Sequence, residues 1–295
     1  VVQQHEDKGF WLVVAGRACE LAPALGPATI VRLLEGLTLC PQEAKQMMGP
    51  IATQMENVLP SFDWEQVVSS MRSLAVIGFY RETLFDTLGR VLPSFVSQFT
   101  PDNVTAMYDC YGRLEVLDTG AMELLAQYVI GNVDAFEPKH WVVIAGTCGK
   151  LKHRDKRLFD LLVSSLLAEN NLAALTVDDL AVLADAFATL KLYSASLFAA
   201  ILDVLNKCLK PGELGPLGDA PLAPGEIKVL MPAEVAPYPT GPDQGPPDYP
   251  VVLLEVQSYV KFVDAFLRLD RASPMNLRAL VPQGYWQLQK LRPPE

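Results

Sequence analysis

The stretch that decides the fold is TVDDLAVLADAFATLKLYSASLFAAILDVLNKCL, residues 176–209. Its apolar side chains recur at the spacing that places them on one face of a helix, as in Leu180, Leu183 and Phe187. A second stripe of the same kind begins at Leu197, after a short polar break. The stretch therefore predicts two short amphipathic helices, one directly after the other.

Thr176 begins the first of these helices, and Asp179 follows three residues later, which is an N-terminal capping signature. A helical hairpin of this size cannot bury its apolar face alone. It needs to stack on similar hairpins, so we expect further copies of the pattern elsewhere in the chain.

The same pattern recurs along the chain as a pair of apolar residues eight positions apart. Towards the N-terminus from Leu190/Phe198, the pairs are Leu151/Phe159, Leu114/Met122, Ile77/Phe85 and Leu39/Met47, at steps of 39, 37, 37 and 38 residues. A sixth pair, Leu269/Leu277, begins 79 residues after Leu190, which is two periods. Four residues before the first member the side chain is small, namely Ser73, Cys110, Thr147, Ala186 and Ala265.

A fixed period of this length with two helices per copy is typical of an α-solenoid. We therefore predict an all-α fold of about six two-helix repeats of about 37–39 residues. The alternative is a helical bundle without repeats. We expect an irregular N-terminal cap over 1–26, repeats over 27–209 and a last repeat with a tail over 251–295.

Residues 210–250 interrupt the repeats and hold 11 of the 23 prolines. Such a composition does not support a regular helix or a central strand. We interpret this stretch as an insertion that acts as a partner-binding arm, with a plain linker as the alternative.

Composition excludes several classes of protein. Half of the 295 residues are hydrophobic and a fifth are charged, as in globular proteins. No apolar run has the length of a membrane span, so we predict no transmembrane helix. The five cysteines form no CxxC pair and the three histidines show no ligand spacing, which predicts reduced thiols, no metal site and no cofactor. Phosphate-binding and hydrolase motifs are also absent, and we expect no enzyme activity.

One local feature departs from the acidic net charge of −10. Five cations lie close together in the turn of the fourth repeat: Lys150, Lys152, Arg154, Lys156 and Arg157. This cluster indicates contact with a phosphate backbone or an acidic partner, and the alternative is a solvated loop containing Asp155. Arg268, Arg271 and Arg278 form a looser basic set in the last repeat, and the two sets would form a discontinuous basic rim if the turns share one edge of the solenoid.

The segments CGKLKHRDKRLF (148–159) and FATLKLYSASLF (187–198) resemble the core of heptatricopeptide/octotricopeptide-type repeats. These repeats occur in FAST-kinase-like and RAP-type organellar proteins, although no RAP domain is evident in this chain. The resemblance implies a mitochondrial matrix protein that binds RNA or belongs to a ribonucleoprotein such as the mitoribosome. The chain begins at Val1, so any targeting peptide is expected to be removed or to lie outside this sequence.

The sequence thus leaves two functions open. The first is a non-catalytic subunit of a mitochondrial ribonucleoprotein that binds RNA, protein partners or both. The second is a purely protein-binding scaffold of a large mitochondrial complex, such as a respiratory complex or ATP synthase.

Overall fold

The computed structural model of the protein describes residues 8–168, 171–208, 226–230, 251–255, 264–265 and 268. Described residues form eleven α-helices: α1 (Lys8–Leu21), α2 (Pro27–Leu37), α3 (Pro41–Val58), α4 (Trp64–Ile77), α5 (Glu82–Val91), α6 (Pro101–Leu114), α7 (Thr119–Gly131), α8 (Pro138–Leu151), α9 (Lys156–Leu167), α10 (Val177–Leu190) and α11 (Ala195–Cys208). The helical character of the fold is as predicted. The chain divides into an N-terminal unit, Val1–Leu161, and a C-terminal unit, Leu162–Glu295.

Four helices begin with the same local device, at steps of 37, 37 and 39 residues. A short 3-10 turn ends at a buried apolar residue, and the next residue caps the helix with its side chain. These residue pairs are Phe62–Asp63, Phe99–Thr100, Phe136–Glu137 and Leu175–Thr176. Each cap accepts a backbone N–H three residues on, while the side chain there accepts the N–H of the cap. The capping pair predicted for Thr176 and Asp179 is therefore confirmed.

The same four helices also end alike. The residue after each helix lies in the left-handed region, and these residues are Gly78, Glu115, Lys152 and Lys191, with φ between 53° and 68°. The N–H of the following residue bonds back to a carbonyl five residues earlier, as in His153 to Cys148 at 2.9 Å. This is the Schellman ending, which satisfies the last carbonyls of a helix and turns the chain sharply.

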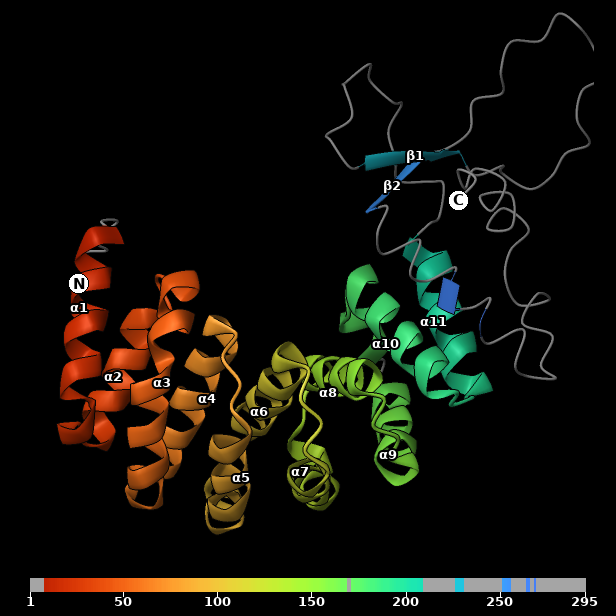
Figure 1. The fold of residues 1–295 in the computed structure, drawn as a ribbon. Coiled ribbons are helices and arrows are strands. Elements are labelled where there is room, and N and C mark those ends of the chain that lie inside the picture. The colour runs from red at the N-terminus through yellow and green to blue at the C-terminus, as the bar shows by residue number, and fades with distance from the viewer. Residues whose placement is uncertain are drawn as a thin grey trace, which may run out of the picture. The chain divides into compact units, whose positions relative to one another are not determined.

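Helices of the N-terminal unit pack in two rows (Figure 1). In one row α2 contacts α4, α4 contacts α6, and α6 contacts α8. In the other row α1 contacts α3, and α3 contacts α5. The hydrophobic core lies between helices that each bury one apolar stripe, and its largest fully buried side chains include Trp141, Tyr108 and Tyr111.

The small residues that lie four positions before the first member of an apolar pair are all buried: Ser73, Cys110, Thr147, Ala186 and Ala265. Between α6 and α8 the approach is especially close. A Cβ atom placed on Gly112 would lie 2.8 Å from Oγ1 of Thr147, and this hydroxyl donates a hydrogen bond of 3.2 Å to the carbonyl of Tyr108. Small side chains here allow the two helix backbones to come together.

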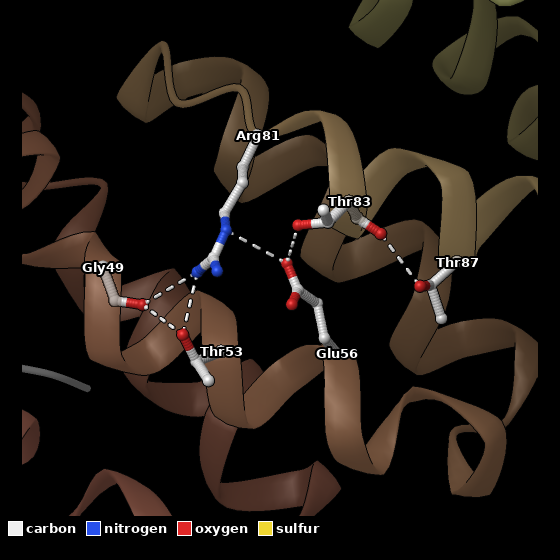
Figure 2. Close-up of polar contacts among 6 residues, drawn as sticks. All are labelled: Gly49, Thr53, Glu56, Arg81, Thr83 and Thr87. Carbon is white, nitrogen blue, oxygen red and sulfur yellow. Dashed lines mark hydrogen bonds and ion pairs between the residues drawn. The ribbon is translucent and has the colours of Figure 1, made fainter.

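A polar network joins α3 to the turn between α4 and α5 (Figure 2). Arg81 donates from Nη1 to Oγ1 of Thr53 at 2.8 Å, and its Nε lies 3.2 Å from Oε1 of Glu56. The same carboxylate oxygen accepts a hydrogen bond of 2.6 Å from the hydroxyl of Thr83. The network therefore connects two successive hairpins through side chains on their surface.

Two details of the first hairpin differ from the sequence prediction. Leu39, the first member of its apolar pair, does not lie in the core, since it is 48% exposed. Cys40, which lies 37 residues before Ile77, is buried in its place. The turn after α2 begins with Thr38 in a right-handed conformation, so it lacks the Schellman geometry of the later turns. The pair Gly49–Pro50 predicts a kink or a restart of this helix, and α3 does not restart there, since it runs as one helix from Pro41 to Val58.

The C-terminal unit contains α10 and α11, which pack together and bring the rings of Phe187 and Phe198 to 6.1 Å. Two strands, β1 (Glu226–Leu230) and β2 (Val251–Glu255), pair antiparallel, with Glu226 opposite Glu255. The last two-helix repeat, predicted to begin at residue 251, therefore does not begin there with a helix. A short apolar run such as 251–254 suits either a strand or a buried helix, and periodicity alone does not separate the two.

Candidate nucleic-acid interface

The basic turn, residues 150–157, connects α8 to α9. The end of α8 and the beginning of α9 together determine its backbone conformation. Lys152 is the left-handed residue of the Schellman ending. Asp155 caps α9, because its Oδ1 accepts the N–H of Leu158 at 3.1 Å. The single acidic residue of the turn thus has a structural role, and the basic residues around it are not needed for the turn.

Two of the five predicted cations are neutralised by neighbours. Lys150 lies 3.2 Å from Oε1 of Glu115, which belongs to the preceding turn. Lys156 lies 2.6 Å from Oδ2 of Asp160, one helical turn away on α9. Both pairs are on the surface, where such pairs contribute little stability. Their main effect is to lower the local positive charge.

The other three cations of the turn, Lys152, Arg154 and Arg157, are exposed. Within the part of the chain that the structure describes, none of the three has a carboxylate within ion-pair distance. Three uncompensated charges therefore remain within six residues, and they are available to an anionic partner.

The second predicted basic set is arranged differently. Arg268 is paired with Asp185, and its Nε lies 3.0 Å from Oδ2 of Asp264. It also donates a hydrogen bond of 2.9 Å to the hydroxyl of Thr189. Its charge is therefore compensated within the C-terminal unit. Arg271 and Arg278 lie outside the described residues.

Exposed apolar side chains at the turns were missed by the sequence analysis. Tyr80 is 46% exposed and Leu117 is 48% exposed. Each lies three residues after the end of the preceding helix. Arg154 has the same position in the next turn. Aligning the repeats by their helix ends, rather than by their apolar pairs alone, could have identified them.

Carboxylates surround Tyr80. Partial burial raises the pKa of its phenol, and Glu82, Asp86 and Asp118 raise that pKa further. The ring is held by Phe85, with the two centroids 5.0 Å apart. This turn thus presents an ordered aromatic side chain within an acidic surrounding, in contrast to the basic turn.

The buried thiols are poor candidates for chemistry. Burial, with a smaller effect of Asp155, raises the pKa of Cys148 to about 12. Burial and Asp109 raise the pKa of Cys110 to about 12 as well. Both therefore stay protonated at neutral pH, and a protonated thiol is a weak nucleophile.

A search of the described ranges finds no group of three or more His, Cys, Asp or Glu side chains that could hold a metal ion. The helices in those ranges also include none that is both long enough and apolar enough to cross a bilayer.

Comparison with known proteins assigns no family: no protein-family model matches the chain, and no match is found among curated proteins. The resemblance to organellar helical repeats therefore stays a hypothesis based on sequence.

Proposed function

We propose that this chain is an α-solenoid and a non-catalytic subunit of a mitochondrial ribonucleoprotein. In this proposal Lys152, Arg154 and Arg157 contact RNA phosphates, and other surfaces contact protein subunits. The mitochondrial matrix location derives from the repeat resemblance and is part of the same proposal.

The solenoid part of the proposal is supported by local structure that recurs with the sequence period. Capping residues recur at 63, 100, 137 and 176, and left-handed helix ends recur at 78, 115, 152 and 191. Packing of α2, α4, α6 and α8 in sequence order is the side-by-side arrangement that repeat proteins use.

The observation that carries the RNA part is the set of three exposed and uncompensated cations in one turn of an acidic chain. With a net charge of −10, long-range electrostatics oppose RNA binding. Binding thus requires a local concentration of positive charge. The basic turn supplies one, and Asp155 beside it is already engaged as a helix cap.

A gel-shift titration with single-stranded RNA at several salt concentrations tests the proposal. The test variant is K152A/R154A/R157A. The control variant, R32A/R90A/K139A, removes three exposed cations from other helices. Loss of three phosphate contacts should reduce the salt slope of binding by about 2, whereas the control should retain the slope of the natural chain.

A second function, the purely protein-binding scaffold, is favoured by the exposed Tyr80 and Leu117. Exposed apolar and aromatic side chains at repeated positions are typical of protein contacts. If the unmodified chain shows no salt-sensitive RNA binding, alone or within the complex that co-purifies with it, the scaffold function replaces the RNA proposal.

A further inference from the structure

Three successive turns of the N-terminal unit present different side chains from one position. The residues are Tyr80, Leu117 and Arg154, each three residues after the end of its helix and separated by 37 and 37 residues. All three are exposed. We name this series the turn edge: an aromatic residue among carboxylates, then an apolar residue, then a basic residue.

Neighbouring turns of this edge lie next to one another. The ion pair of Lys150 with Glu115, at 3.2 Å, joins the second turn to the third. Asp118 of the second turn lies against α5, the helix that follows the first turn, since a Cβ atom placed on Gly89 would lie 3.3 Å from its Oδ2. Because α4 packs on α6 and α6 on α8, the steps between turns are similar, roughly 10 Å each.

The two ends of the turn edge carry opposite charge. At one end Glu82 and Asp86 are exposed, and the structure gives neither a cation within ion-pair distance among the described residues. At the other end the cations are Lys152, Arg154 and Arg157. Leu117 lies midway. An edge ordered as acidic, apolar and basic at equal steps is complementary to itself when it is turned end for end.

We propose that two copies of this chain associate through their turn edges about a two-fold axis beside Leu117. In this arrangement Leu117 of one copy meets Leu117 of the other. Arg154 and Lys152 of each copy meet the carboxylates around Tyr80 of the other, as an isologous interface requires. The guanidinium of Arg154 also reaches the face of the Tyr80 ring, which favours a cation.

Local order on the edge assists this association. The Tyr80 ring packs against the ring of Phe85. The centroid of the Phe85 ring lies 6.0 Å from the centroid of the buried Tyr111 ring. A side chain that is already ordered loses little conformational entropy on binding. Long-range repulsion between two chains of net charge −10 acts against the dimer, so the specific charge pairs and the apolar centre are what hold it.

This inference does not rest on the RNA proposal, although the two meet at the basic turn. A second copy on the turn edge covers Lys152 and Arg154, and RNA would have to displace it. The chain would then bind RNA as a monomer and self-associate without RNA.

Charge-reversal variants studied by analytical ultracentrifugation test the dimer without RNA. The natural chain should sediment as a concentration-dependent dimer. K152E/R154E and E82K/D86K should each lose the dimer, because each places like charges together. An equimolar mixture of the two variants should recover it, since every contact then joins opposite charges. Recovery also shows that both variants are folded.

A natural chain that remains monomeric at tens of micromolar overturns the proposal, and so does a mixture that fails to recover the dimer while both variants keep their helical circular dichroism. The E82K/D86K variant distinguishes failure of the dimer proposal from failure of the RNA proposal. It leaves the basic turn intact, so it should lose the dimer and keep any RNA binding of the natural chain.

Discussion

The guanidinium of Arg81 lies 3.2 Å from the carboxylate of Glu56 and joins the turn before α5 to the last turn of α3 (Figure 2). At this position of their turns Asp118, Asp155 and Ser194 each accept a backbone N–H of the helix that follows. Arg81 makes no such cap. Its side chain instead reaches across to the neighbouring hairpin, so a local helix cap is exchanged for a contact between hairpins.

Replacing Arg81 with Ala should lower the free energy of unfolding by about 1 kcal/mol, because it removes the ion pair and the hydrogen bond to Thr53. A double-mutant cycle with Glu56→Ala, measured by urea unfolding, should give a coupling of about 0.5 kcal/mol. Arg90→Ala removes an exposed arginine for which no ion pair is seen among the described residues, and it should leave stability nearly unchanged. Equal effects of the two single substitutions would contradict the role of Arg81.

Gly112→Ala should destabilise the protein by about 1–3 kcal/mol, although alanine favours helices. The added Cβ would lie 2.8 Å from Oγ1 of Thr147 across the α6–α8 contact. Thermal unfolding should show a lower Tm for Gly112→Ala, and Thr147→Ala in the same chain should relieve part of the loss. Gly16→Ala is the control, since a Cβ there meets nothing within 4 Å and should be neutral or stabilising.

His153→Leu should stabilise the protein by about 1 kcal/mol. Nε2 of His153 is buried, and no hydrogen-bond partner is found for it among the described residues. The equivalent positions after the other Schellman endings hold Phe79, Val116 and Leu192. Urea unfolding measures the gain, and the three uncompensated cations of the turn are untouched, so RNA binding should be unchanged. A loss of stability would show that the imidazole has a polar partner.

Helix ends were the most predictable part of this fold. The capping pair Thr176 and Asp179 is predicted from sequence alone, and α10 begins at Val177, directly after Thr176, because capping is a local signal. Leu39 shows where such reasoning fails. Apolar spacing alone selects Leu39 as the first member of its pair, whereas the residue at the 37-residue step is Cys40, which is less conspicuous in sequence.

The basic residues of both sets could be identified from sequence, but whether each is paired with a carboxylate could not. Pairing of Lys150 with Glu115 and of Arg268 with Asp185 depends on packing between residues 35 and 83 positions apart. Tyr80 and Leu117 were missed for a related reason. An apolar residue in a helical repeat is normally assigned to the core, and only the turn geometry shows that these two face outward.

Lys152→Gly should separate stability from binding. Lys152 has a φ of 56°, a conformation that glycine adopts without the cost paid by other residues. We expect a gain in the free energy of unfolding of up to about 1 kcal/mol, together with weaker RNA binding, because one of the three cations is lost. Lys191→Gly is the matched control, with a similar φ of 53° in the next Schellman ending. It should stabilise the protein and leave binding by the basic turn unchanged.

Alkaline pH should destabilise the protein through its buried thiols. Burial raises the pKa of Cys148 from 9.0 to about 12, so the folded chain holds a proton that the unfolded chain has released. The stabilisation is complete below pH 9 and is lost as pH rises towards 12, at about 1.4 kcal/mol per pH unit for each such thiol. Urea unfolding between about pH 8 and pH 11 measures the slope.

Cys148→Ala should reduce this slope by about one proton, whatever its effect on stability at neutral pH. Ser73→Ala changes a buried side chain that does not titrate in this range, and it should keep the slope of the natural chain. The buried Tyr111, whose pKa is also raised by burial, adds to the slope equally in all three proteins. Tyr108 is different, because burial raises its pKa and Cys148 raises it further, so Cys148→Ala also removes a small part of the Tyr108 contribution. An unchanged slope in Cys148→Ala would mean that the thiol already reaches solvent in the folded state.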